Sequence, residues 1–328
     1  MKKLYTLLLL SSLSYAQVTL PHYDGFDYTA GQTLQTQTGW VSLNSGDDLV
    51  ISSNSLNFTG LQSSTGNKVI FDGTGIDAGK DFTSQNANTT YFSFLLNVTD
   101  LTTATNAAGG YQFGFVQGTG TSFGATIWTK RVDDNNYNIG INPRTTAANT
   151  VFSPTNYSIN ETYLVVGSYT FVDGTANDIV SLWINPTPGG SQPSPIATAT
   201  NTGGTDLTSV SRFLVRQGSA TDTPFIQFDE LRIGTTWADV TPEASASLND
   251  NNISGLKMYP NPLKGNTLFL TSTANANMSV QIYDVLGKEV LKSNVMNNAV
   301  NVSGLNAGVY IVKITEEGKT ATRKLVIQ

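Results

Sequence analysis

Apolar residues along the chain come in short runs that alternate with polar residues, and clusters of glycine, asparagine and aspartate separate these runs. An alternation with a period of two is typical of half-buried β-strands. In residues 90–98 both alternating faces are largely apolar, which predicts a central strand that is covered on both sides. No window shows a sustained helical period. The pattern therefore predicts an all-β protein.

Residues 17–241, called the passenger below, contain about eleven such segments, enough for a single large antiparallel sandwich or jelly roll. Turn-forming residues separate the segments, as in the aspartate and asparagine run at 133–136. The expected strands are 48–52, 55–58, 68–71, 90–98, 111–117, 124–132, 137–141, 162–171, 179–184, 212–217 and 225–233.

Residues 256–328 show the same alternation on a smaller scale. Val280 and Ile282 alternate with polar neighbours, and so do Val312 and Ile314. This segment predicts a small immunoglobulin-like β-sandwich. Its expected strands are 256–259, 267–271, 279–283, 288–292, 299–302, 308–314 and 320–327.

The first sixteen residues have the organisation of a secretory signal peptide. Lys2 and Lys3 precede a short leucine-rich stretch, and small residues mark a cleavage site between Ala16 and Gln17. The apolar stretch is about ten residues long, whereas a bilayer-spanning helix needs ~20. We therefore expect an exported protein without a transmembrane segment.

Charge divides the rest of the chain. Residues 17–241 hold 8 Lys and Arg against 18 Asp and Glu, a net charge of −10, whereas residues 256–328 hold 8 against 4, a net charge of +4. Residues 242–255, between them, are small and polar, which predicts a linker.

Four blocks of the C-terminal segment resemble the type A C-terminal sorting domain of the type IX secretion system. They contain, in order, Tyr259-Pro260-Asn261-Pro262, then Gly287 within 280–288, then Gly308 and Tyr310 within 305–314, and finally 324–327. The resemblance implies binding to an outer-membrane translocon and a sortase, and display on the surface of a Bacteroidetes-type cell or release from it. The alternative is an immunoglobulin-like module with an adhesive role.

The passenger resembles concanavalin A-like, laminin G-like jelly-roll domains. The similarity lies in residues 22–28, 163–166, 178–186 and 228–240. It implies a fold and no single function, because this architecture hosts lectins, carbohydrate-binding modules, adhesion domains, glycosidases and lyases.

Composition narrows the chemistry. The chain has no cysteine and one histidine, His22, which excludes thiolate chemistry and leaves little room for a Ser-His-Asp triad. The passenger has two glutamates, Glu161 and Glu230, too far apart in sequence for the paired carboxylates of a retaining glycosidase. The composition thus favours a non-catalytic protein that binds a glycan or matrix or acts in adhesion. A glycosidase or lyase on the same fold and a purely structural surface protein are the alternatives.

Calcium is the one cofactor that the sequence suggests. Alternation places Asp229 on the buried face of its strand, where a carboxylate must be paired or bound to metal. Asp24 or Asp27 is the expected partner, because the first and last strands of jelly rolls often lie side by side. The alternative is that Asp229 accepts hydrogen bonds and that Asp24 and Asp27 shape a turn.

A sugar site needs aromatic faces flanked by polar side chains, and Trp128 and Tyr137 are the aromatic residues chosen for it. Packing within the strands is the alternative role for both. The negative passenger lacks a basic stripe that could neutralise phosphates, so nucleic acid is not an expected partner.

Overall fold

The computed structural model describes residues 17–244 and 253–328. The predicted signal peptide and its last residue, Ala16, lie outside these ranges. The chain divides into two compact units, Met1–Ser245 and Ala246–Gln328. Within the described ranges, no helix combines the length and the apolar character that a membrane crossing requires.

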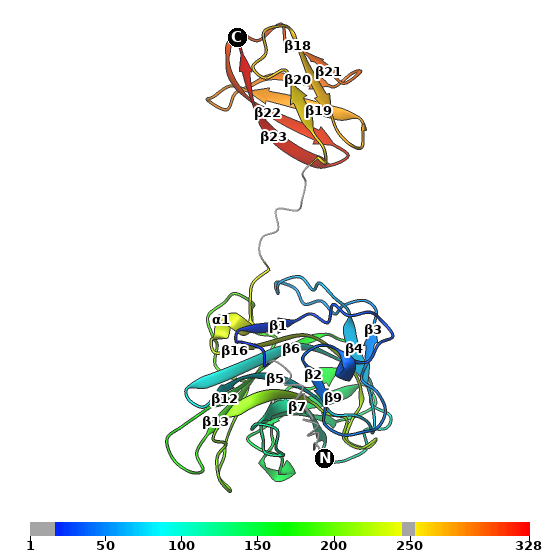
Figure 1. Cartoon of the computed structure of the whole chain (residues 1–328), viewed down its shortest axis with the longest axis vertical. Coiled ribbons are helices and arrows are strands. Elements are labelled where there is room, and N and C mark those ends of the chain that lie inside the picture. Colours follow the sequence, from blue (N-terminus) through cyan, green and yellow to red (C-terminus); the bar gives the residue numbers. More distant parts are fainter. Residues whose placement is uncertain (1–16, 245–252) are drawn as a thin grey trace, which may run out of the picture. The chain divides into compact units, whose positions relative to one another are not determined.

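The passenger contains two eight-stranded antiparallel sheets. In the first sheet, β6 (Thr89–Asp100) lies between β12 (Tyr163–Thr170) and β16 (Phe225–Gly234), as Figure 1 shows. Beyond β12 follow β13 (Ile179–Ile184) and β14 (Ala197–Thr200). On the other side, β16 pairs with both β4 (Lys68–Phe71) and β1 (His22–Asp24), and β3 (Val50–Ser52) pairs with β4.

The second sheet is centred on β7 (Gly110–Val116). One half runs through β8 (Phe123–Arg131) and β9 (Asn136–Asn142) to β10 (Val151–Phe152) and β11 (Tyr157–Ser158), which both pair with β9. The other half runs through β15 (Val210–Val215) and β5 (Ala78–Gln85) to β2 (Trp40–Ser42). Three short helical turns complete the unit: η1 (Leu34–Thr36), η2 (Ala147–Asn149) and α1 (Trp237–Val240).

The facing surfaces of the two sheets enclose the core. Phe94 of β6 lies 4.3 Å from Phe113 and 5.3 Å from Phe228, measured between ring centroids. The opposite face of β6 is also covered, since Leu95 belongs to a second apolar cluster with Leu56, Trp183, Trp237 and Val240. The prediction of a central strand covered on both faces is therefore confirmed, and the all-β sandwich with it.

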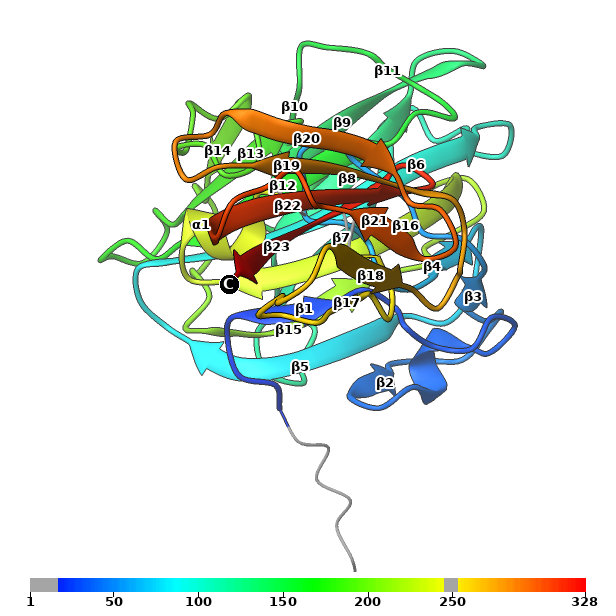
Figure 2. The ribbon, with the colours of Figure 1, turned by 90° about the horizontal axis from the view of Figure 1, so that it is seen from above.

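The C-terminal unit is a small β-sandwich. A three-stranded sheet has the order β17 (Lys257–Tyr259), β18 (Thr267–Thr271), β21 (Ala299–Asn301). A four-stranded sheet has the order β20 (Glu289–Asn294), β19 (Met278–Tyr283), β22 (Gly308–Glu316), β23 (Lys319–Ile327), and Figure 2 shows these four strands side by side. The alternation is as predicted, because Val280, Ile282, Val312 and Ile314 are all buried.

Residues of the C-terminal motif make contacts that stabilise the unit. The side-chain amide of Asn261 binds the backbone of β23. Its Nδ2 donates to the carbonyl of Lys324 at 2.7 Å, and its Oδ1 accepts from the N–H of Val326 at 2.9 Å. Tyr310 donates its hydroxyl to the carbonyl of Asn306 at 2.8 Å. Gly287 has a φ of +83°, which closes the hairpin between β19 and β20 at low conformational cost.

Both ends of the expected linker belong to folded structure. The N–H of Ala244 donates to the carbonyl of Gly60, and the carbonyl of Pro242 accepts from Gln62. At the other end, Ile253 is 2% exposed and lies in the core of the C-terminal unit. The prediction that all of 242–255 is a linker is therefore corrected at both ends, where the residues belong to the folded units. Residues 245–252 lie outside the described residues.

Candidate functional site

A β-bulge in β16 creates the most unusual polar arrangement of the passenger. Pairing between β16 and β6 shifts register between Asp229 and Arg232, and Glu230 has a φ of +57°. A buried residue other than glycine rarely adopts this left-handed conformation, and bulges of this kind re-aim side chains. Strict alternation predicted that Asp229 lies on the buried, core-facing side of its strand. That prediction is wrong, because the extra residue in the bulge places both carboxylates on the outer face.

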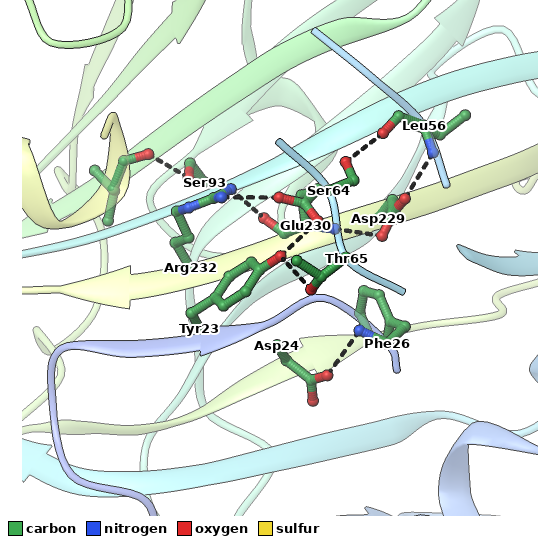
Figure 3. A network of polar contacts seen from close by, with 11 residues as sticks. Tyr23, Asp24, Phe26, Leu56, Ser64, Thr65, Ser93, Asp229, Glu230 and Arg232 are labelled. Carbon is green, nitrogen blue, oxygen red and sulfur yellow. Dashed lines mark hydrogen bonds and ion pairs between the residues drawn. The ribbon is translucent and has the colours of Figure 1, made fainter. Parts of the chain in front are cut away.

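Figure 3 shows how these groups are satisfied. Tyr23 of β1 donates its hydroxyl to Oε1 of Glu230 at 2.7 Å, and Nη2 of Arg232 donates to Oε2 of the same carboxylate at 2.8 Å. The guanidinium of Arg232 lies 4.6 Å from the centroid of the Tyr23 ring. Burial raises the pKa of Tyr23 to about 12. These two hydrogen bonds connect β1 to β16, and each oxygen of the Glu230 carboxylate accepts one of them.

The aspartates proposed for calcium lie in two separate networks. Asp229 accepts hydrogen bonds from the N–H groups of Leu56 and Glu230, both at 2.7 Å. Asp24 forms an ion pair with Lys80 at 3.0 Å and accepts from Trp40 at 2.9 Å. Asp27 is exposed.

The hydrogen-bonding alternative therefore describes the environment of Asp229 and Asp24 in this structure. Burial raises the pKa of Asp24, but the charge of Lys80 and the hydrogen bonds outweigh it and lower the pKa overall. Among the described residues, no group of three or more acidic or histidine side chains is arranged to hold a metal. Calcium binding stays a prediction.

Asp229 should make the stability of the passenger depend on pH. Burial raises its pKa from 3.8 to about 8, so between these values the folded state keeps a proton that the unfolded state has lost. Stability should then fall as pH rises through this window, by up to about 1.4 kcal/mol per pH unit. Asp229→Asn cannot ionise and should flatten the slope. Urea unfolding at several pH values measures it, with the exposed Asp134→Asn as control; equal slopes in wild type and Asp229→Asn would contradict the assignment.

The outer face of the second sheet carries a different group of side chains. Tyr111 of β7 lies opposite Trp128 of β8, with ring centroids 5.6 Å apart. The guanidinium of Arg216, which follows β15, lies 4.2 Å from the centroid of Tyr111. Asp77 precedes β5 on the same side and accepts a hydrogen bond from the N–H of Gln217 at 2.9 Å. We call Asp77, Tyr111 and Arg216 the sheet-face triad.

The sheet-face triad combines an acid, a base and a cation. Burial raises the pKa of Tyr111 above its usual value, with Arg216 opposing and Asp77 reinforcing the shift. Burial also raises the pKa of Asp77, while the charge of Arg216 opposes this. Tyr111 therefore stays protonated at neutral pH, and Asp77 is a stronger base than an exposed aspartate. Such perturbed groups beside a charge are typical of catalytic sites.

Further positive charge lies on the same face. The ammonium of Lys130 on β8 lies 4.2 Å from the ring centroid of Phe152 on β10. Arg212 of β15 forms a two-point ion pair with Asp81 of β5. Among the described side chains, neither Lys130 nor Arg216 takes part in a salt bridge. An acidic passenger thus presents two cations outside any described salt bridge on the face that carries an aromatic pair, which suits an anionic ligand.

The two aromatic residues chosen from the sequence have different fates. Tyr137 is fully buried against Tyr157 and Tyr163, so its ring has no free face for a sugar. Trp128 is 4% exposed and donates its indole N–H to Thr126 at 3.0 Å. It therefore packs against the ring of Tyr111 and presents little surface to a sugar. Sequence analysis missed the sheet-face triad. Its members come from three segments that are far apart in the sequence. The one signal in the sequence was that Arg212 and Arg216 are four residues apart, a spacing that puts both on the same face of a strand.

A family comparison identifies the C-terminal unit. Residues 257–328 match the model of the secretion system C-terminal sorting domain. This confirms the sorting domain expected from the sequence. The protein is exported by the type IX route to the cell surface or extracellular space of Bacteroidetes. The domain implies contact with the secretion machinery.

A curated relative is similar to part of the chain. An endo-acting ulvan lyase of Formosa agariphila is 27% identical over 126 residues, which cover 36% of this chain and 23% of the lyase. The aligned stretch is longer than the 257–328 match, so the similarity extends outside the sorting domain. The chain spans about a quarter of the length of this relative.

Solved structures with a similar outline include two carbohydrate-active enzymes. A family 7 alginate lyase, A1-II′, has a TM-score of 0.32 at 10% identity, over 61% of this chain and 92% of that one. A sialidase from Trypanosoma rangeli has a TM-score of 0.33 at 12% identity, over 61% of this chain and 31% of that one.

The lyase relative contradicts the expectation that the protein is not an enzyme. The composition argued against paired glutamates and a Ser-His-Asp triad, and on that ground a glycosidase or lyase was placed second to a non-catalytic protein. Elimination needs neither arrangement, because a cation, a proton acceptor and a proton donor suffice. The sheet-face triad holds one of each.

Proposed function

We propose that the passenger is an exported lyase that cleaves an acidic polysaccharide by β-elimination on the outer face of the second sheet. The observation that carries the proposal is the sheet-face triad, with Arg216 4.2 Å from the ring of Tyr111 and Asp77 bonded to Gln217, the residue that follows Arg216. The ulvan lyase relative supports the same class of reaction.

Each member of the triad has a role in this reaction. Arg216 pairs with the carboxylate of a uronate residue and makes the neighbouring C–H proton more acidic. Asp77 accepts that proton as the carbon–carbon double bond forms and the bond to the leaving oxygen breaks. Tyr111, still protonated at neutral pH, donates its proton to the leaving oxygen. Lys130 lies along the same face and attracts the next anionic residue of the polymer.

A substrate screen tests the proposal. The chain 17–328 should release unsaturated ends, detected by ultraviolet absorbance, from at least one uronate-containing polysaccharide such as ulvan, alginate or polygalacturonate. Neutral polysaccharides such as laminarin should remain uncleaved, because they offer no carboxylate for Arg216. Activity that appears only on neutral polymers, or tight binding of acidic polymers with no cleavage, would contradict the proposal.

A further inference from the structure

A pocket of about 630 Å³ lies at one end of the passenger, away from the sheet-face triad. Three connections form it: 86–88 between β5 and β6, 171–178 between β12 and β13, and 205–208 between β14 and β15. It lies beyond the last residue of β5 and before the first of β15, whereas Asp77 and Arg216 flank the other ends of these strands. At ~3.3 Å per residue, the six residues of β15 separate the two places by roughly 20 Å.

The floor of the pocket is a fixed carboxylate network. Asp206 accepts hydrogen bonds from the N–H of Asn177 at 2.9 Å and from Nδ2 of Asn201 at 2.6 Å. Asp178, 2% exposed, accepts from the hydroxyl of Tyr169 at 2.6 Å and from the N–H of Val172 at 2.7 Å. These bonds join 171–178 to 205–208, and the N–H of Phe171 donates to the carbonyl of Asn88 at 2.9 Å, so all three connections are tied and the pocket is preformed.

Hydrogen-bond acceptors are in excess there. Asn177 and Asn201 do not line the pocket but lie behind its lining residues Asp178 and Asp206; within the described part of the chain their side-chain oxygens are buried without a donor. Asp173 is exposed at the rim, as are the amide side chains of Asn86 and Asn88. No lysine or arginine lines the pocket. A ligand for this site must bring donors and carry no negative charge.

One wall of the pocket is apolar. Phe171 lies among the lining residues, half-buried, with its ring 4.9 Å from that of Tyr169. An aromatic face beside amide and carboxylate groups suits a pyranose, whose ring presents C–H bonds on one side and hydroxyl donors at its edge. Small donor molecules such as ammonium or urea have no apolar C–H face to place against Phe171.

We propose that this pocket binds a neutral saccharide residue. It lies apart from the sheet-face triad and has the opposite charge preference, so it anchors a neutral portion of a glycan while the triad engages acidic residues. The inference stands on the pocket alone and does not require that the passenger be a lyase.

Saturation-transfer NMR on the chain 17–328 tests this, with methyl glycosides of neutral hexoses, pentoses and deoxyhexoses as probes and glucuronate as the acidic probe. At least one neutral glycoside should bind. The double variant Asp173→Ala, Asn86→Ala should weaken it about tenfold through the loss of two hydrogen bonds. The control Asp134→Ala, Asn135→Ala removes an exposed aspartate and asparagine from the turn after β8.

The outcomes separate this site from the proposed function. Neutral binding that persists in Arg216→Ala and disappears in the pocket variant supports the inference even if no polymer is cleaved. Binding that Arg216→Ala abolishes, equal binding of glucuronate in the pocket, or no binding of any neutral glycoside would overturn it. A thermal shift with calcium alone, lost in the pocket variant and without saccharide binding, would also overturn it in favour of a cation site.

Discussion

Replacing Tyr111 with phenylalanine should lower the turnover of an acidic polysaccharide by about 10²–10⁴-fold, the usual contribution of a positioned proton donor. The change removes one hydroxyl and keeps the ring that contacts Trp128 and Arg216. The melting temperature should therefore change little. Arg216→Ala should cost about 10²–10³-fold, because the carboxylate of the substrate would lose its counter-charge as negative charge develops. Initial rates of unsaturated product formation measure both effects.

The matched control is Tyr91→Phe. Tyr91 is also a half-buried tyrosine on the outer face of a sheet, but it belongs to the first sheet and contacts Trp183 and Trp237. Its loss of a hydroxyl should leave the rate unchanged. Asp77→Asn, which keeps the acceptor for Gln217 but cannot take a proton, should slow the reaction as strongly as Tyr111→Phe. Full activity in Tyr111→Phe together with Asp77→Asn would remove the triad from the reaction.

Deleting residues 253–328 should abolish display of the passenger on the cell surface. The deletion starts at Ile253, because this residue is part of the core of the sorting domain. The passenger has its own core and should stay folded, so it should accumulate in the periplasm with its melting temperature intact. Protease treatment and antibody labelling of intact cells, with fractionation, measure the distribution.

A point variant sharpens this test. Asn261→Ala removes both hydrogen bonds by which the side chain holds the last strand, and it should reduce display without touching the passenger. Asn297→Gly, in an exposed turn where Asn297 already has a φ of +52°, is the matched control and should be displayed normally. Normal display of the deleted form would contradict the sorting role and favour an adhesive module instead.

The elements that the sequence predicts well are those that depend on neighbours along the chain. The period of two located β6, β12 and β19, because each strand buries one or both faces regardless of its partner. The sorting domain was predictable from its sequence motif, in which Gly287 acts within its own turn, whereas Asn261 bonds to the distant residues Lys324 and Val326. Local rules were sufficient for the fold.

The candidate site depends on geometry that local rules do not contain. Arg216 and Tyr111 are 105 residues apart and meet only because β15 pairs with β7. The bulge at Glu230 reverses the parity of Asp229, which no alternation reveals. Tyr137 was misjudged although it shares a face with Ile139 and Ile141, the apolar positions of β9, which alternation places in the core. The sequence does not show where a bulge changes the face on which a side chain lies, or which distant strands pair.

The chemistry of bond cleavage is the most direct test of the central claim, that the sheet-face triad cleaves an acidic polysaccharide by elimination. The chain 17–328 is incubated with a uronate polymer in water enriched in the heavy isotope oxygen-18, and the masses of the products are measured by mass spectrometry. The proposed elimination leaves one unsaturated end per cleavage and adds no heavy oxygen in the cleavage step, because the bond breaks without addition of water. Saturated products with one heavy oxygen per cleavage, carried by one of the two new ends, would contradict it, since they would show hydrolysis.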